Sequence, residues 1–135
     1  MAKETMRENL EQLAQELLEK RQLAATLENT RVKSDIKRVR AERSLVEKEA
    51  EHLLRVLNAK DEAGKLTYSN ESSRKAELTC RLAADEQIIA LIKLIDRAKL
   101  RSARLELDQQ VIRAQAMKLA TMEKLYLIEM EKRIL

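Results

Sequence analysis

The chain has 135 residues and a formal net charge of +4, yet it contains one glycine, no proline and only two tyrosines as aromatic residues. Many tight turns need Gly or Pro, so a many-stranded sandwich or barrel is excluded, as are enzymes that need a glycine-rich phosphate loop. Apolar residues make up 44% and recur periodically, which is not typical of a disordered chain. The composition therefore predicts an all-α protein built from a few long helices.

Several features predict a cytoplasmic protein that does not associate with membranes. Cys80 is the only cysteine and cannot form an internal disulfide. The first residues have no apolar core of a signal peptide. The most apolar run, 88–95, is interrupted by Lys93 and is shorter than the roughly 18 apolar residues of a membrane span.

The first helix is predicted from about residue 5 to about residue 63, beginning at a capping box formed by Thr5 and Glu8. Two apolar runs follow with steps of three and four residues, with Lys20 as the exception in the first run and Arg43 in the second. The first run contains Met6, Leu10, Leu13, Leu17, Ala24 and Leu27, and the second contains Val32, Ile36, Val39, Val46, Ala50, Leu53 and Leu57. Because a step of five separates the runs, we interpret them as one stripe on a nearly straight helix rather than as one heptad frame.

A turn is predicted at about residues 64–70, because Gly64 suits the left-handed position after a helix. Ser69 or Asn70 is expected to cap a second helix that runs from about residue 70 to about residue 133. The predicted fold is a single domain over residues 1–135, a long antiparallel, coiled-coil-like hairpin of two helices. A continuous helix through Gly64 is the alternative.

The second helix is too apolar for a single neighbour. Six large apolar residues fall between Ile88 and Ile95, and a helix that is apolar on more than one face usually has more than one partner. We therefore expect two hairpins to form a homodimeric four-helix bundle, or else this face to dock on another protein. The predicted interface comprises Ile88, Ile89, Leu91, Ile92, Ile95, Leu105, Ile112 and Leu119.

Positive charge is concentrated in two segments, 31–43 and 93–104, each with a net charge of +4. If the hairpin folds near Thr67, these segments face each other and form a basic belt suited to phosphate groups. The belt comprises Arg31, Lys33, Lys37, Arg38, Arg40, Arg43, Lys93, Arg97, Lys99, Arg101 and Arg104. The alternative is that these side chains are solvated and pair locally with acidic residues. Aromatic residues for base stacking are lacking, so contact would be independent of nucleic-acid sequence.

Residues with catalytic potential are few. His52 and Cys80 are the one candidate nucleophile pair, and the hairpin would bring them near each other, but two helix flanks offer no substrate pocket. One His and one Cys are also too few for a zinc site. We therefore predict no catalytic residues, no metal site and no cofactor.

The turn segment Asp61–Leu78, DEAGKLTYSNESSRKAEL, resembles the hairpin turn of small uncharacterised helical proteins of phage and plasmid replication or recombination modules. The resemblance covers mainly turn-forming and capping positions, and it implies an accessory protein of a virus or mobile element acting in the host cytoplasm.

These observations favour a non-enzymatic, oligomeric helical scaffold or protein-interaction protein. One alternative is a nucleic-acid-binding accessory protein that uses the basic belt. A second alternative is an inhibitor or adaptor that docks on a host or phage protein.

Overall fold

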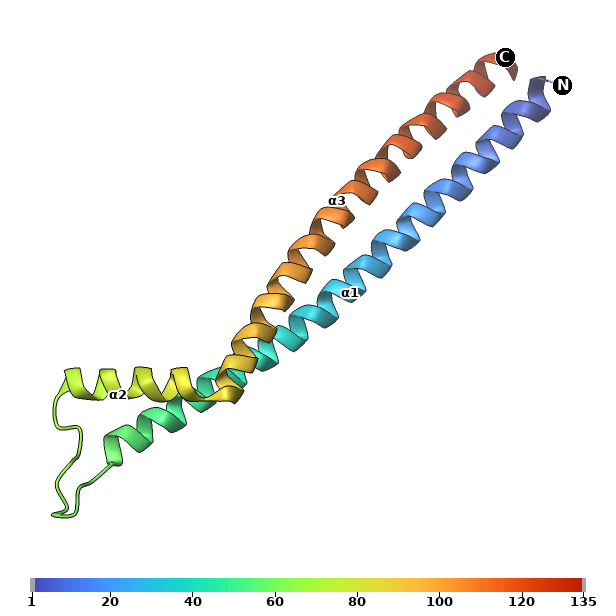
Figure 1. Ribbon diagram of the computed structural model, residues 1–135. Helices are drawn as coiled ribbons and strands as arrows, with labels where there is room; N and C mark the ends of the chain where they lie inside the picture. Colours follow the sequence, from blue (N-terminus) through green and yellow to red (C-terminus); the bar gives the residue numbers. More distant parts are fainter. Residues whose placement is uncertain (1, 135) are drawn as a thin grey trace. The chain divides into compact units, whose positions relative to one another are not determined.

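The computed structural model describes residues 2–134, and regular structure in this range is helical (Figure 1). Helix α1 spans Ala2–Asn58, α2 spans Glu71–Ala84 and α3 spans Glu86–Ile134. The only strand-like pairing in the described range is an isolated bridge between Lys60 and Leu66. The prediction of an all-α protein is confirmed, and α1 packs against α3 as expected for the arms of a hairpin.

The chain divides into two compact units, each containing parts of both long helices. Unit 1 combines Met1–Lys33 with Arg101–Leu135, and unit 2 is Ser34–Leu100. In unit 1, the beginning of α1 and the end of α3 lie at the same end (Figure 1). In unit 2, Lys48 contacts Gln87 and His52 contacts Asp85, so the chain segments run antiparallel there.

The protected positions of α1 follow one seven-residue repeat, which we call the inner stripe of α1. It begins with the first predicted run, where Met6, Leu13 and Leu17 are buried. It continues with steps of three and four through positions that are mostly polar or small. These later positions are Arg31, Ser34, Arg38, Ala41, Leu45, Lys48 and His52. The second predicted run falls outside this repeat, so the prediction that the two runs do not share one heptad frame is confirmed.

The second predicted run lies on a different face of α1. Val46 is 64% exposed, and the other large residues of this run are also exposed. The expectation of one continuous apolar stripe is therefore wrong. The steps of three and four that include Leu27 continue to Arg31 and Ser34, and Val32 and the later residues of the second run lie on a different face of the helix.

Helix α3 has a matching inner stripe. Its less exposed positions recur every three and four residues from Ile88 to Met130. The stripe includes Ile88, Leu91, Ile95, Ala98, Ser102, Leu105, Gln109, Ile112, Ala116, Leu119, Glu123, Tyr126 and Met130. A repeat of this period keeps the same face of the helix toward its neighbour over a long distance.

The loop between α1 and α2 contains the predicted turn, but it is longer than expected. Gly64 has φ +80°, the left-handed conformation expected for it, although α1 already ends at Asn58. Asn70 caps α2 as predicted, with its side-chain Oδ1 accepting a hydrogen bond of 2.7 Å from the Ser73 amide. At the other end, α1 includes residues before Thr5, so the predicted capping box does not mark its beginning.

Candidate functional site

The predicted second helix is interrupted at Asp85, which gives three helices instead of two. The Asp85 backbone is extended, with φ −78° and ψ 109°, and its amide still donates to the Arg81 carbonyl of α2. Its side-chain Oδ1 accepts hydrogen bonds from the amides of Gln87 at 2.9 Å and Ile88 at 3.3 Å. Asp85 therefore ends α2 and caps the N-terminus of α3.

His52 of α1 contacts Asp85, the residue at which the helix is interrupted. Its Nε2 lies 2.7 Å from Oδ2 of Asp85, and both side chains are partly buried. This contact, followed by the two amide hydrogen bonds, lowers the pKa of Asp85 below its ordinary value. The partner of His52 is thus Asp85 and not the predicted Cys80, whose side chain is exposed.

A buried polar contact joins α1 and α3 in unit 1. Gln109 is only 3% exposed, and its Nε2 donates to Glu28 at 2.8 Å. Arg31 donates two hydrogen bonds to the same carboxylate, from Nη2 at 2.7 Å and from Nε at 3.3 Å. The hydrogen bonds from Arg31 and then Gln109 lower the pKa of Glu28. A buried polar contact of this kind between two paired helices favours one register over the others.

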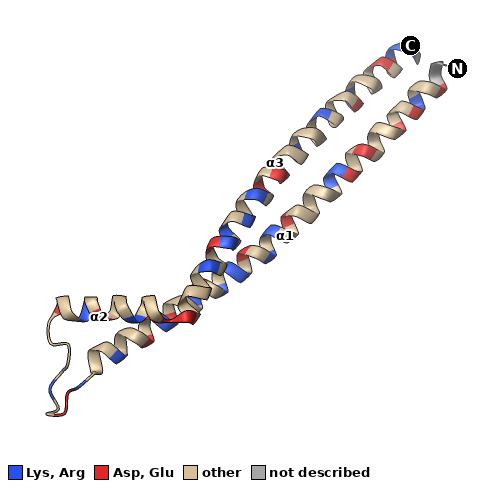
Figure 2. Ribbon diagram, viewed as in Figure 1, with Lys and Arg blue, Asp and Glu red and all other residues tan. Residues whose placement is uncertain are grey.

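The residues of the basic belt are divided between the units. In unit 2 they lie on both α1 and α3, where Figure 2 shows Lys and Arg on each helix. Arg38 lies 3.0 Å from Glu42 and 3.9 Å from Asp35, and Arg31 in unit 1 pairs with Glu28, as the local-pairing alternative anticipates. Nine side chains of the belt are exposed, and these are Lys33, Lys37, Arg40, Arg43, Lys93, Arg97, Lys99, Arg101 and Arg104.

Most residues of the predicted oligomer interface belong to the inner stripe of α3. Ile88 and Ile95 are buried, and Leu91, Leu105, Ile112 and Leu119 are partly covered. Ile89 and Ile92 are exposed. The inner-stripe residues face the chain's own α1, so the surface left for a partner differs from the one that the sequence suggested.

Two outward surfaces carry exposed apolar residues. On α1, the outer stripe consists of Ile36, Val39, Arg43, Val46, Ala50, Leu53 and Leu57, with steps of three and four. On α3 in unit 1, Leu107, Val111, Leu125 and Ile128 are between 48% and 62% exposed. The sequence signal for the outer stripe was the second apolar run, which was correctly identified as periodic but assigned to the wrong face.

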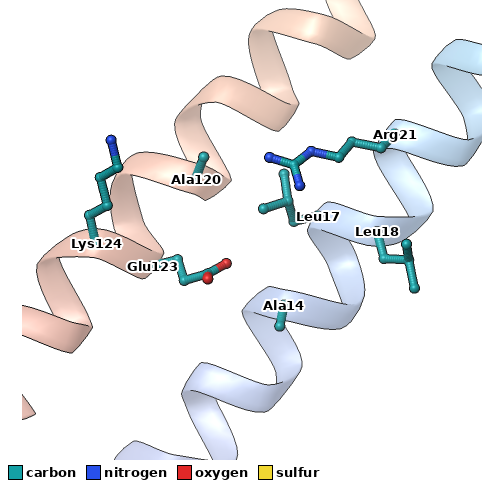
Figure 3. A pocket seen from close by; sticks show the side chains of 7 residues that line it. All are labelled: Ala14, Leu17, Leu18, Arg21, Ala120, Glu123 and Lys124. Atoms are coloured by element: carbon teal, nitrogen blue, oxygen red, sulfur yellow. The ribbon is translucent and has the colours of Figure 1, made fainter.

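A groove lies between α1 and α3 in unit 1, where Ala14 and Ala120 leave space between the helices (Figure 3). Leu17 and Arg21 extend from α1 toward α3, and Glu123 extends from α3 toward α1 (Figure 3). The lining consists of Ala14, Leu17, Leu18, Arg21, Ala120, Glu123 and Lys124. The groove combines apolar walls with charged groups at its margin, an environment suited to a side chain of a neighbouring helix.

Among the described residues, no three His, Cys, Asp or Glu side chains come together in a way that could hold a metal ion. No helix in the described part of the chain is long and apolar enough to cross a membrane. Comparison with protein-family models, with curated proteins and with solved structures gave no match for this chain.

Proposed function

We propose that this protein is a non-enzymatic helical scaffold that works by associating with further copies of itself. The observation that carries the proposal is the amount of apolar surface left outside in both units. Val46 and Leu53 are exposed in unit 2, and Leu107, Val111 and Leu125 are exposed in unit 1. Contiguous apolar surface of this kind marks an interaction site rather than a solvated face.

The inner stripes support a coiled-coil type of packing within each copy. Leu13 and Leu17 of α1 and Ile88 and Ile95 of α3 occupy positions of unbroken seven-residue repeats. Helices with such repeats supercoil around each other in a left-handed sense, and they readily accept further helices with the same repeat. Self-association would thus extend the packing that already holds α1 to α3.

Sedimentation equilibrium over a concentration range of about 1–200 μM tests the proposal. The expected result is a mass that rises with concentration from the 15.6 kDa of one chain toward a multiple of it. A mass of one chain at every concentration would show that the protein does not self-associate. In that case the exposed surface serves a different protein, as in the adaptor alternative.

A second candidate function is sequence-independent binding to nucleic acid, which is supported by the exposed basic residues of unit 2. Arg40 and Arg97 are exposed and project from α1 and α3. Charge reversal of both is expected to weaken duplex binding and to reduce its salt dependence, by about 0.9 in the logarithmic slope per lost phosphate contact. Reversal of Lys118 and Lys132, exposed basic residues outside the belt, is the matched control.

Gel shifts with duplex and single-stranded DNA at several salt concentrations provide the measurement. No shift at the lowest salt, or equal losses in both variants, would dismiss a role for the belt. The hypothesis that the protein comes from a phage or plasmid module rests only on the resemblance of the turn segment Asp61–Leu78, and it stays a prediction.

A further inference from the structure

The outer stripe of α1 has the pattern of a helix-packing surface, although it faces away from the inner stripe. Its positions alternate by steps of three and four from Ile36 to Leu57, and Arg43 is its only charged member. The large apolar residues are between 39% and 64% exposed. Because seven-residue repeats on two faces follow the same supercoil, the outer stripe can pack along a further helix over its whole length.

The exposed area matches what a modest dimer needs. The five large apolar residues of the outer stripe expose roughly 400 Å² in each copy, which is already the size of the largest patch on a typical monomer. Two copies would bring together about 800 Å² of apolar surface. A stable interface buries about 1,200–2,000 Å² in total, of which roughly 60% is apolar. A second copy of the same stripe therefore supplies enough surface.

Arg43 decides the orientation of such a pair. In a parallel pair in register, Arg43 would meet its own copy inside an apolar interface, which is costly for two like charges. In an antiparallel pair, Arg43 lies opposite the partner's Val46, while Val39 lies opposite the partner's Ala50 and Ile36 opposite the partner's Leu53. The apolar members of the stripe then meet one another, and the long Arg43 side chain can reach solvent beside the partner's Val46.

The flanking charges add one favourable and one unfavourable contact in the antiparallel pair. Arg40 lies beside the partner's Glu47 on one flank, and the two-fold axis produces this pair twice. On the other flank, Glu42 approaches the partner's Glu49. The charge of Glu42 is already offset by Arg38 of its own helix, at 3.0 Å. The opposite-charge pairs therefore outweigh the like-charge pairs.

We propose that two copies of this chain associate through the outer stripes of their α1 helices, antiparallel, about a two-fold axis next to Ser44 and Leu45. This inference rests on the proposed self-association, and it assigns the interface to α1 instead of the predicted face of the second helix.

Cysteine cross-linking tests the orientation in a Cys80→Ser background, which removes the exposed native thiol. Disulfides form only when the Cα atoms lie within about 7 Å. The Val39→Cys/Ala50→Cys double variant is expected to give a covalent dimer under mild oxidation. Each single variant should stay at the collision background set by Met117→Cys, at an exposed position on α3, and a mixture of the two single variants should form the covalent dimer. Efficient cross-linking of Val39→Cys by itself would overturn the antiparallel arrangement.

Sedimentation of charge variants separates failure of this inference from failure of self-association. Val39→Glu/Leu53→Glu is expected to weaken the dimer at least 100-fold, whereas the matched Leu100→Glu/Met117→Glu variant on α3, at residues 63% and 73% exposed, should leave the dissociation constant within about threefold. Arg43→Leu is expected to tighten the dimer at least tenfold. If the unsubstituted protein forms dimers that only the α3 variant disrupts, the α1 interface is refuted while the scaffold proposal stands. If the unsubstituted protein remains a monomer throughout, both are refuted.

Discussion

Replacement of Val56 by Ala tests the packing of unit 2. Val56 is 0% exposed, whereas Val46, nearly three turns earlier on the same helix, is 64% exposed. Deleting two buried methyl groups costs about 1.6 kcal/mol in transfer free energy, and a residual cavity raises the loss to about 2–3 kcal/mol. The higher helix propensity of Ala offsets about 0.5 kcal/mol. The free energy of unfolding should therefore fall by about 2 kcal/mol.

Val46→Ala is the matched control because it makes the same chemical change on the same helix. In dilute solution, where any dimer dissociates, only the gain in helix propensity remains, and the free energy of unfolding should rise by a few tenths of a kcal/mol. Urea unfolding followed by circular dichroism measures both, and a slope of about 2 kcal/mol per molar converts the Val56 effect into a midpoint lower by about 1 M. Equal midpoints for the two variants would refute the placement of Val56 in the core.

Three further predictions concern single positions. His52 lowers the pKa of Asp85, so the ionised carboxylate stabilises the folded state above the ordinary pKa of 3.8, and this stabilisation is lost as the pH falls through the lowered value. The Asp85→Asn variant lacks this carboxylate, and its free energy of unfolding in urea should therefore fall less steeply between about pH 5 and pH 3. Gln109→Leu should raise the free energy of unfolding by about 1 kcal/mol, because Glu28 keeps its partner Arg31 while the buried amide becomes apolar, and thermal melting that shows a decrease instead would contradict this. Gly64→Ala should lower the free energy of unfolding by about 1 kcal/mol through backbone strain at φ +80°, since no atom lies within 4 Å of the added methyl group, and an unchanged urea midpoint would argue against this.

The break at Asp85 shows why the helices could be predicted and their interruption could not. The segment around it, with Ala83, Ala84 and Glu86, favours helix by local propensity. The residue that fixes the break is His52, 33 positions away in the sequence. Local signals identified the Asn70 cap because both partners lie in the same turn, but Asp85 depends on a contact made only after α1 and α3 meet.

The face of α1 was mispredicted for a related reason. Taking apolar residues as inward selects Val39 and Val46, but the inner stripe of unit 2 contains Ser34, Lys48 and His52. Long polar side chains tolerate these positions because their stems pack while their charged ends reach solvent. An α-helix advances by about 100° per residue, so two apolar runs separated by a step of five fall on different faces of α1.

The helical repeat gives a prediction that links the fold to self-association. Insertion of two alanines after Asn29 would advance the phase of the following residues by about 200°, and Ile36 would then occupy the inner position now held by Arg38. The other members of the outer stripe would likewise take inner positions. We expect this variant to remain helical and to sediment as a monomer at concentrations where the unsubstituted protein forms dimers.

The control is the same two-alanine insertion after Glu62, in the loop beyond α1, which leaves the phase of the helix unchanged and should leave the dimer intact. Continued dimer formation by the Asn29 insertion variant would mean that the outer stripe is not the interface. Loss of dimer in both variants would instead place the interface near the loop. A selective loss would explain why apolar residues lie outside on a helix whose polar residues lie inside, because only a second copy covers them.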